Sequence, residues 1–249
     1  MRIHLLASCL VVILGIGPAA AEYKEIAVTN GGAIAGRVRV TGEIPVLPPQ
    51  PVFKHQETCG ESIPDQRLLT GSDGALRNVV VHLVDVKAGK AVSRERPVTL
   101  DNVKCAFVPH VLSAAVGQTI EIHNSDPFLH DAQAWLGPKT LFNVAVPANR
   151  TVRRPLAYAG LVHINCNVRH TWMHAYLFIA DHPYHTVTDA DGRFQISDLP
   201  AGKYTLSFWH ELLGSVDREV TVESGKAATV DLEFPASAPE GSPGKAVSE

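Results

Sequence analysis

The residues best suited to chemistry lie in the ten-residue segment CNVRHTWMHA, which begins at Cys166. This segment brings together a thiol at Cys166, an imidazole at His170 and a thioether at Met173. Type 1 copper sites use a thiolate and two imidazoles near a trigonal plane, with a weak axial ligand that is often Met. Three such ligands commonly come from one loop between two strands, and a fourth from an earlier strand. In the segment HNSDPFLHDA, His130 is the candidate for that fourth ligand.

The N-terminus predicts an oxidising compartment. Arg2 precedes the apolar run LLASCLVVILGIG and then PAAAE, which is the pattern of a secretory signal peptide cleaved after Ala21. A lipoprotein box at LASC is disfavoured, because too few apolar residues precede Cys9. The mature chain is therefore expected to be periplasmic or secreted. No other segment approaches the roughly 20 apolar residues that span a bilayer, and a net charge of −3 with scattered basic residues gives no sign of nucleic-acid binding.

Three cysteines remain after cleavage, namely Cys59, Cys105 and Cys166. With an odd number, at least one is unpaired, pairs between chains or binds a ligand. Histidines and a methionine surround Cys166, whereas the other two cysteines have no close run of ligand-type residues. We therefore predict a disulfide between Cys59 and Cys105, with Cys166 as a metal thiolate. The alternative is that Cys166 pairs with one of the other two.

Each proposed ligand has an ordinary explanation when taken alone. A methionine in an apolar strand usually belongs to the core, and a histidine such as His170 is more often a surface residue. The combination favours copper, because Met173 is the only methionine after cleavage and lies seven residues after the odd cysteine. Structural zinc is the main chemical rival, but zinc would not use Met173. If Met173 is remote, His174 is the substitute ligand, and the site would resemble the red copper type.

Strand patterns recur between turn residues along the chain, and helical patterns are weak. The clearest strand segments are 33–40, 76–86, 117–124, 140–147, 160–166 and 175–181. They predict an all-β sandwich or barrel. From Thr186 the strands become shorter, with an Asp191-Gly192 hairpin signal, and this predicts a second small β-module over 183–234. The final residues, 235–249, are rich in Pro, Ala, Ser and Gly and are predicted to be a disordered tail.

The segments IEIHNSDPFLHDA and INCNVRHTWMHAYLFIADHPY resemble the cupredoxin family. The resemblance is closer to secreted plastocyanin-like proteins that carry a carboxypeptidase-regulatory-like β-module, some of them labelled methylamine utilisation proteins. The stretch TDADGRFQISDLPAGKYTLSFWHELLG resembles that module, so the similarity covers roughly 32–234. It implies a cupredoxin-like Greek-key sandwich over 22–182 and a transthyretin-like or carboxypeptidase-regulatory-like module over 183–234. It also implies one copper per chain, held by His130, Cys166, His170 and Met173.

Two features depart from the family pattern. Plastocyanin-like loops often read C-x2-H, whereas this loop reads C-x3-H-x2-M, like the second half of the binuclear copper loop of cytochrome oxidase. A binuclear centre needs another cysteine four residues earlier, where Val162 stands, so we do not expect one. Asp131 occupies the position where cupredoxins often have an Asn that ties the two ligand loops together, so the surroundings of the metal could be altered.

Several other residues have competing interpretations. His110 is a candidate extra ligand but is more simply a histidine bonded to backbone. By strand alternation, His163 points away from the metal. Trp172 is expected to be partly exposed beside the metal, as a packing residue or a docking residue. His182, His185 and His210 are candidates for a second metal cluster between the modules, but the stretch from Trp209 to Glu211 is more simply explained by hydrogen bonds across the module interface.

The resemblance implies an electron carrier whose redox partner is a protein, a cytochrome or a dehydrogenase, and no enzymatic activity is expected. In support, the sequence has no hydrolytic or phosphate-binding motif. A small redox enzyme with an open or red copper position is one alternative. The other is a copper storage or delivery protein whose C-terminal module docks a protein or a glycan.

Overall fold

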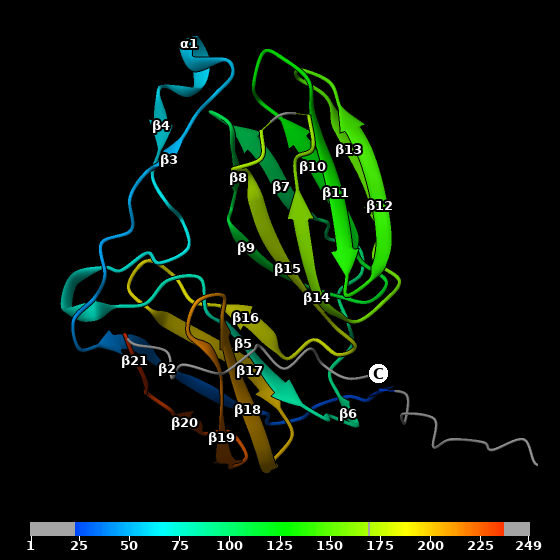
Figure 1. Cartoon of the computed structure of the whole chain (residues 1–249). Helices are drawn as coiled ribbons and strands as arrows, with labels where there is room; N and C mark the ends of the chain where they lie inside the picture. Colours follow the sequence, from blue (N-terminus) through cyan, green and yellow to red (C-terminus); the bar gives the residue numbers. More distant parts are fainter. Residues whose placement is uncertain (1–22, 169, 237–249) are drawn as a thin grey trace, which may run out of the picture.

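The computed structural model describes residues 23–168 and 170–236, and Figure 1 shows them folded into two β-sandwiches. The predicted signal peptide, 1–21, and the tail from 237 onward lie outside the described residues. Apart from one short helix, the described residues form β-strands and loops, which confirms the predicted all-β class. The one α-helix among the described residues is the four-residue α1 (Gln56–Cys59).

Two mixed sheets form the first sandwich. The first sheet has the order β13 (Thr151–Pro155), β10 (Thr119–Asn124), β7 (Val98–Val103), β8 (Ala106–Val108). The second sheet has the order β12 (Lys139–Val146), β11 (His130–Leu136), β14 (Gly160–Asn165), β15 (His174–Ala180), β9 (Val111–Ala115). Strand alternation explains the core between them: in β10, Ile120 and Ile122 are fully buried, whereas Glu121 and His123 are only partly buried.

The second sandwich also has two sheets. One has the order β16 (His185–Val187), β5 (Val80–Val84), β18 (Gly202–His210), β19 (Gly214–Val222). The other has the order β17 (Arg193–Leu199), β2 (Gly32–Thr41), β20 (Ala227–Thr229), and β21 (Leu232–Pro235) also pairs with β2. A separate two-stranded pair joins β1 (Lys24–Glu25) to β6 (Ala88–Gly89).

The predicted domain boundary at 182/183 is wrong for the N-terminal strands. β2 and β5 were expected in the first module, but β2 pairs with β17, β20 and β21, and β5 pairs with β16 and β18. Their buried residues Ile34, Val38 and Val81 belong to the core of the second sandwich. Apolar alternation marks a strand but does not name its partner, so the sequence pattern could not assign these strands to a sheet.

The segment between β2 and β5, residues 42–79, forms an arm whose middle part, 50–63, lies alongside the first sandwich (Figure 1). Leu76 and Val79, at its end, belong to the core of the second sandwich. It carries β3 (Gln50–Pro51), α1, β4 (Ser62–Ile63) and the short 3₁₀ turn η1 (Ser72–Gly74). The predicted disulfide is confirmed: Cys59 of the arm is bonded to Cys105 between β7 and β8, with a Cα–Cα separation of 5.4 Å. Val52, Cys59 and Ile63 join the core of the first sandwich, so the arm is packed onto that sandwich.

The candidate cluster of His182, His185 and His210 is not formed. His182 Nε2 donates to the carbonyl of Leu83 at 2.9 Å, and the backbone N–H of Leu212 donates to His210 Nδ1 at 3.3 Å. His185 lies opposite His82 in the β16–β5 pair. Among the described residues, none of these three belongs to a group that could hold a metal ion. His182 lies in the loop before β16, and His210 ends β18.

His185 should make the metal-free protein less stable in mild acid. Burial, with the nearby charges of His182, His82 and Lys90, lowers the pKa of His185 to about 3, whereas an unfolded histidine titrates near 6.5. As the pH falls from 7 to 5, the unfolded chain therefore binds a proton at His185, whereas the native state does not. The free energy of unfolding should fall by about 1–2 kcal/mol from this group between pH 7 and pH 5. Urea unfolding at both pH values checks this, and His185→Gln should reduce the difference; an unchanged difference would contradict it.

Candidate metal centre

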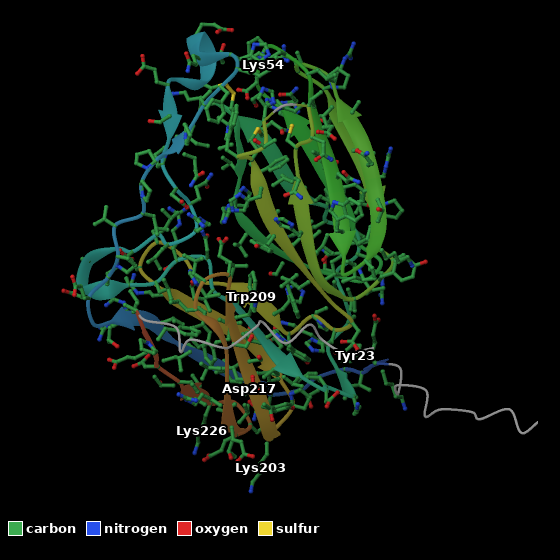
Figure 2. All side chains as sticks on the ribbon, in the orientation of Figure 1. Tyr23, Lys54, Lys203, Trp209, Asp217 and Lys226 are labelled. Atoms are coloured by element: carbon green, nitrogen blue, oxygen red, sulfur yellow. A yellow bond between two sulfur atoms is a disulfide. The ribbon has the colours of Figure 1, made fainter. Side chains whose placement is uncertain are left out.

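The proposed ligands meet at the end of the first sandwich that lies beside the arm. His130 is the first residue of β11, Cys166 follows β14 directly, and Met173 immediately precedes β15. His170 lies in the loop between β14 and β15. Because β11, β14 and β15 are neighbours in one sheet, their ends bring these residues together. In Figure 2 the sulfur atoms, drawn yellow, lie at this end, where Lys54 is labelled.

Three of the four predicted ligands form a compact donor set. Cys166 Sγ lies 3.6 Å from His130 Nδ1 and 3.7 Å from His170 Nδ1. All three residues are buried, and their ligand atoms lie within 4.8 Å of one another. A sulfur about 2.3 Å and a nitrogen about 2.0 Å from one metal, at 120°, would be about 3.7 Å apart. Both sulfur–nitrogen distances therefore fit ligands of a single metal ion.

Met173 lies in the same core and shapes the ligand loop through its backbone. Its side chain is buried. The N–H of Met173 donates to the carbonyl of His170 at 2.9 Å, and the N–H of Cys166 donates to the carbonyl of Met173 at 3.3 Å. These two hydrogen bonds close the segment from Cys166 to Met173 into a turn, which carries both Cys166 and His170.

Burial keeps both titratable ligands of the loop uncharged. It raises the pKa of the Cys166 thiol to about 12, although backbone N–H groups of Asp131 and Val168 act in the opposite direction. It also lowers the pKa of His170 to about 4, with a smaller contribution from the neighbouring imidazole of His130. The Nε2 atom of His170 is buried and has no hydrogen-bond partner. A metal cation that replaced the thiol proton would supply the charge that stabilises a thiolate here.

The sequence reasoning missed Asp126, which orients His130. His130 Nε2 donates to Asp126 Oδ2 at 2.9 Å, so its Nδ1 keeps a lone pair that faces the thiol. The same carboxylate accepts the backbone N–H groups of Lys104 and Cys105, at 2.7 and 2.8 Å. Burial opposes ionisation of Asp126, but these hydrogen bonds outweigh it and lower the pKa. The available signal was an Asp four residues before a candidate ligand, in the turn SDPFLH.

Asp131 joins the two ligand loops as an acceptor. Its Oδ1 accepts the backbone N–H groups of Asn167 and Val168, the latter at 3.2 Å. These residues follow Cys166, and Asp131 follows His130. The link therefore requires only acceptor atoms, and the Asp that departs from the family pattern provides them.

The arm covers the outer side of the donor set. The ring of His55 stacks on Phe128 with centroids 3.9 Å apart, and lies 5.6 Å from the ring of His170. Trp172 was expected to be partly exposed, but it is buried, and its Nε1 donates to the carbonyl of Cys105 at 3.0 Å. The difference arises because the disulfide-linked arm fills the space over the loop, and Phe53 of the arm packs edge-on against Trp172.

Two further histidines lie away from the donor set. His163 stacks on Tyr176, with ring centroids 5.0 Å apart, which agrees with the alternation that pointed it away from Cys166. The Nε2 atom of His110 contacts the carboxylate of Glu211. A bond to backbone was expected, and this contact with a side chain of the second sandwich differs from it.

The comparisons with known proteins match separate parts of the chain. The family model of the carboxypeptidase regulatory-like domain matches residues 174–235, which run from β15 to β21. This agrees with the predicted C-terminal module. No curated protein matches the sequence, so the methylamine-utilisation label stays a prediction. No helix among the described residues is long and apolar enough to cross a membrane.

Solved structures similar to this chain include three copper proteins or cupredoxins. The chain is 27% identical to the Cu-containing nitrite reductase from Thermus scotoductus SA-01, over 35% of this chain and 23% of that one, with a TM-score of 0.32. An amicyanin mutant in its reduced state is 18% identical over 34% of this chain and 83% of its own, with a TM-score of 0.31. The purple cupredoxin from Nitrosopumilus maritimus is 19% identical over 33% and 99%, with a TM-score of 0.30. The chain thus spans less than a quarter of the nitrite reductase.

Proposed function

We propose that this protein is a mononuclear copper protein that transfers electrons, with one copper per chain. Cys166, His130 and His170 would form the trigonal plane, and Met173 would be the weak axial ligand. The observation that carries the proposal is the buried donor set, with Cys166 Sγ at 3.6 and 3.7 Å from two imidazole nitrogens. Copper in such a set cycles between Cu(I) and Cu(II). The surrounding residues hold the ligands in one geometry and exclude water.

Burial favours electron transfer over catalysis at this centre. His130, Cys166 and His170 are at most 1% exposed, and the arm covers the ring of His170 through His55 and Phe128. A small redox enzyme needs an open coordination position that a substrate can reach. An electron needs no such opening. The same burial disfavours storage or delivery, because release of the metal would require the loop or the arm to open.

The substitute ligand His174 is engaged elsewhere, which favours Met173 as the axial group. His174 Nδ1 lies 3.2 Å from the carbonyl of Trp172, and Nε2 lies 3.6 Å from a carboxylate oxygen of Glu211. Both ring nitrogens therefore face partners outside the donor set, and a red copper site built on His174 is disfavoured.

We also propose a periplasmic or secreted location after cleavage near Ala21, and a redox partner protein such as a cytochrome or a dehydrogenase. Phe53 lies two residues before His55 in the arm, and Leu129 directly follows Phe128. Both are exposed apolar residues, with 77% and 45% of their surface accessible. Exposed apolar side chains of this kind suit a transient protein contact.

The visible and electron paramagnetic resonance spectra of the mature protein, loaded with Cu(II), test this function. We expect one copper per chain and an intense sulfur-to-copper charge-transfer band, and Cys166→Ser should lose the band. Reduction and reoxidation should be reversible, and azide should leave the spectrum unchanged. A colourless copper complex, or a band that survives in Cys166→Ser, would refute the thiolate site. An azide-induced spectral change would favour the enzyme, and rapid loss of copper to a mild chelator would favour delivery.

Met173→Leu should retain copper but change its potential. The leucine fills a similar volume and removes only the thioether, so the trigonal plane survives, whereas loss of an axial donor to Cu(II) favours Cu(I). We expect an unchanged copper stoichiometry and a higher reduction potential, measured by voltammetry and by titration with a redox mediator. An unaltered potential would mean that Met173 is only a core residue.

A further inference from the structure

A second group of potential metal ligands lies where the two sandwiches meet. His110 precedes β9 and His174 begins β15, both in the first sandwich, while Glu211 lies in the turn between β18 and β19 of the second sandwich. In Figure 2 the neighbouring Trp209 is labelled between the two sandwiches, and its ring packs 5.0 Å from that of Tyr176. The group is separate from the copper ligands and comes from both cores.

The three side chains converge on one point. The carboxylate of Glu211 contacts His110 Nε2 through one oxygen, and its other oxygen lies 3.6 Å from His174 Nε2. The ligand atoms all lie within 4.8 Å of one another. The two imidazole rings stand nearly perpendicular, with centroids 4.9 Å apart. Two imidazole nitrogens and a carboxylate are the ligands of many zinc sites, and their fourth position is open.

The orientation of His174 indicates that a cation belongs in this group. Its Nδ1 lies 3.2 Å from the carbonyl of Trp172. A carbonyl only accepts hydrogen bonds, so Nδ1 carries a hydrogen, and Nε2, which faces the Glu211 carboxylate, is the nitrogen available to a proton or to a metal ion. Either cation would stabilise the carboxylate beside it. A backbone carbonyl behind the distal nitrogen is also the usual way in which a metal-binding histidine is oriented.

The surroundings can accommodate such a cation. The side chains of His110 and Glu211 are 2% and 4% exposed, and that of His174 is 25% exposed, so the group is largely dry with an opening at His174. Arg67 is the positive side chain close to Glu211 and His174. It is paired with Asp65 at 2.6 Å, which balances its charge. The ring of His163 lies 6.1 Å from that of His174, and His210 directly precedes Glu211 in the chain.

We propose that His110, His174 and Glu211 bind one divalent transition cation of the zinc type at the junction, and that this cation links the two sandwiches. Because its ligands come from both sandwiches, the cation would stabilise their contact. The proposal does not depend on the copper function. A shared proton between His174 and Glu211 is the competing occupant, and it predicts no metal binding.

Zinc binding by a variant without the first donor set tests the proposal. The full mature chain carrying Cys166→Ser and His170→Ala lacks two of the three copper-plane ligands, so its zinc binding reports the junction. We expect one Zn²⁺ per chain by equilibrium dialysis with elemental analysis, and a Tm that rises when Zn²⁺ is added. Glu211→Gln and His110→Gln, each added to this background, should weaken binding by at least about tenfold. Glu219→Gln removes an exposed carboxylate from the same hairpin and should have no effect.

The outcomes separate the junction from other sites and from misfolding. Circular dichroism of each variant shows whether it has folded, and the two independent ligand variants guard against the failure of one. The d–d absorption bands of bound Co²⁺ should also disappear in both. The proposal is overturned if the background variant binds no zinc. It is equally overturned if binding survives in Glu211→Gln and His110→Gln. Neither result bears on the charge-transfer band of the protein with an intact Cys166.

Discussion

Replacing Asp126 with alanine should lower copper affinity by about 10–100-fold and destabilise the protein by about 2–3 kcal/mol. One carboxylate accepts from His130 Nε2 and from the N–H groups of Lys104 and Cys105. Its removal leaves three donors without this partner, and two of them, His130 Nε2 and the N–H of Cys105, are buried. An unsatisfied buried donor costs more than a simple lost bond. The imidazole of His130 would also be free to rotate or to change tautomer.

Asp126→Asn separates the two effects. Its amide oxygen, in the place of Oδ2, can still accept from His130 Nε2 and from the N–H of Cys105, whereas the NH₂ group meets the N–H of Lys104 and the negative charge beside His130 is lost. We expect this variant to fold with a smaller loss of stability and still to bind copper weakly. Asp101→Ala is the control, because Asp101 bonds Ser125 of the same turn at an exposed position.

Copper affinity by competition with a chelator of known strength, and urea unfolding of the metal-free proteins, provide the two measurements for the Asp126 variants. Copper affinity in Asp126→Ala equal to that of Asp101→Ala would show that the carboxylate has no role in orienting His130.

Removing the disulfide by the paired change Cys59→Ala and Cys105→Ala should lower the free energy of unfolding by about 3–4 kcal/mol. The bond closes a loop of 46 residues between the arm and the β7–β8 turn, so the unfolded chain gains conformational freedom when it is lost. Urea unfolding of the oxidised and reduced wild type beside the variant measures this. The reduced wild type should resemble the variant, and the variant itself should not respond to the reductant.

The same change should loosen the cover over His170. The arm carries His55, which packs against Phe128 and lies 5.6 Å from the ring of His170, and Cys59 is its covalent attachment. In the copper-loaded variant we expect faster electron exchange between molecules, together with a new response of the spectrum to azide. Unaltered stability and unaltered exchange would both show that packing of Val52 and Ile63 alone holds the arm in place.

Features that depend on neighbours along the chain can be predicted from the amino-acid sequence alone. The loop from Cys166 to Met173 carries its donor atoms within eight residues, and alternation in segments such as 117–124 defines strands whatever their partners are. The odd number of cysteines, and the absence of ligand-type residues near Cys59 and Cys105, predicted the disulfide between these two. The all-β class and the C-terminal module followed from patterns of the same local kind.

Contacts between distant segments could be identified only from the tertiary structure. β2 and β5 pair with strands more than one hundred residues later, the arm lies over His170, Asp126 supports His130, and Glu211 reaches His110 and His174. An apolar alternation fits any sheet, and a lone Asp or Glu has the same local signature in a solvated turn as beside a buried imidazole. Strand pairing and burial arise from long-range packing of the whole chain. That packing places Asp126 beside His130, and it places Glu211 beside His110 and His174.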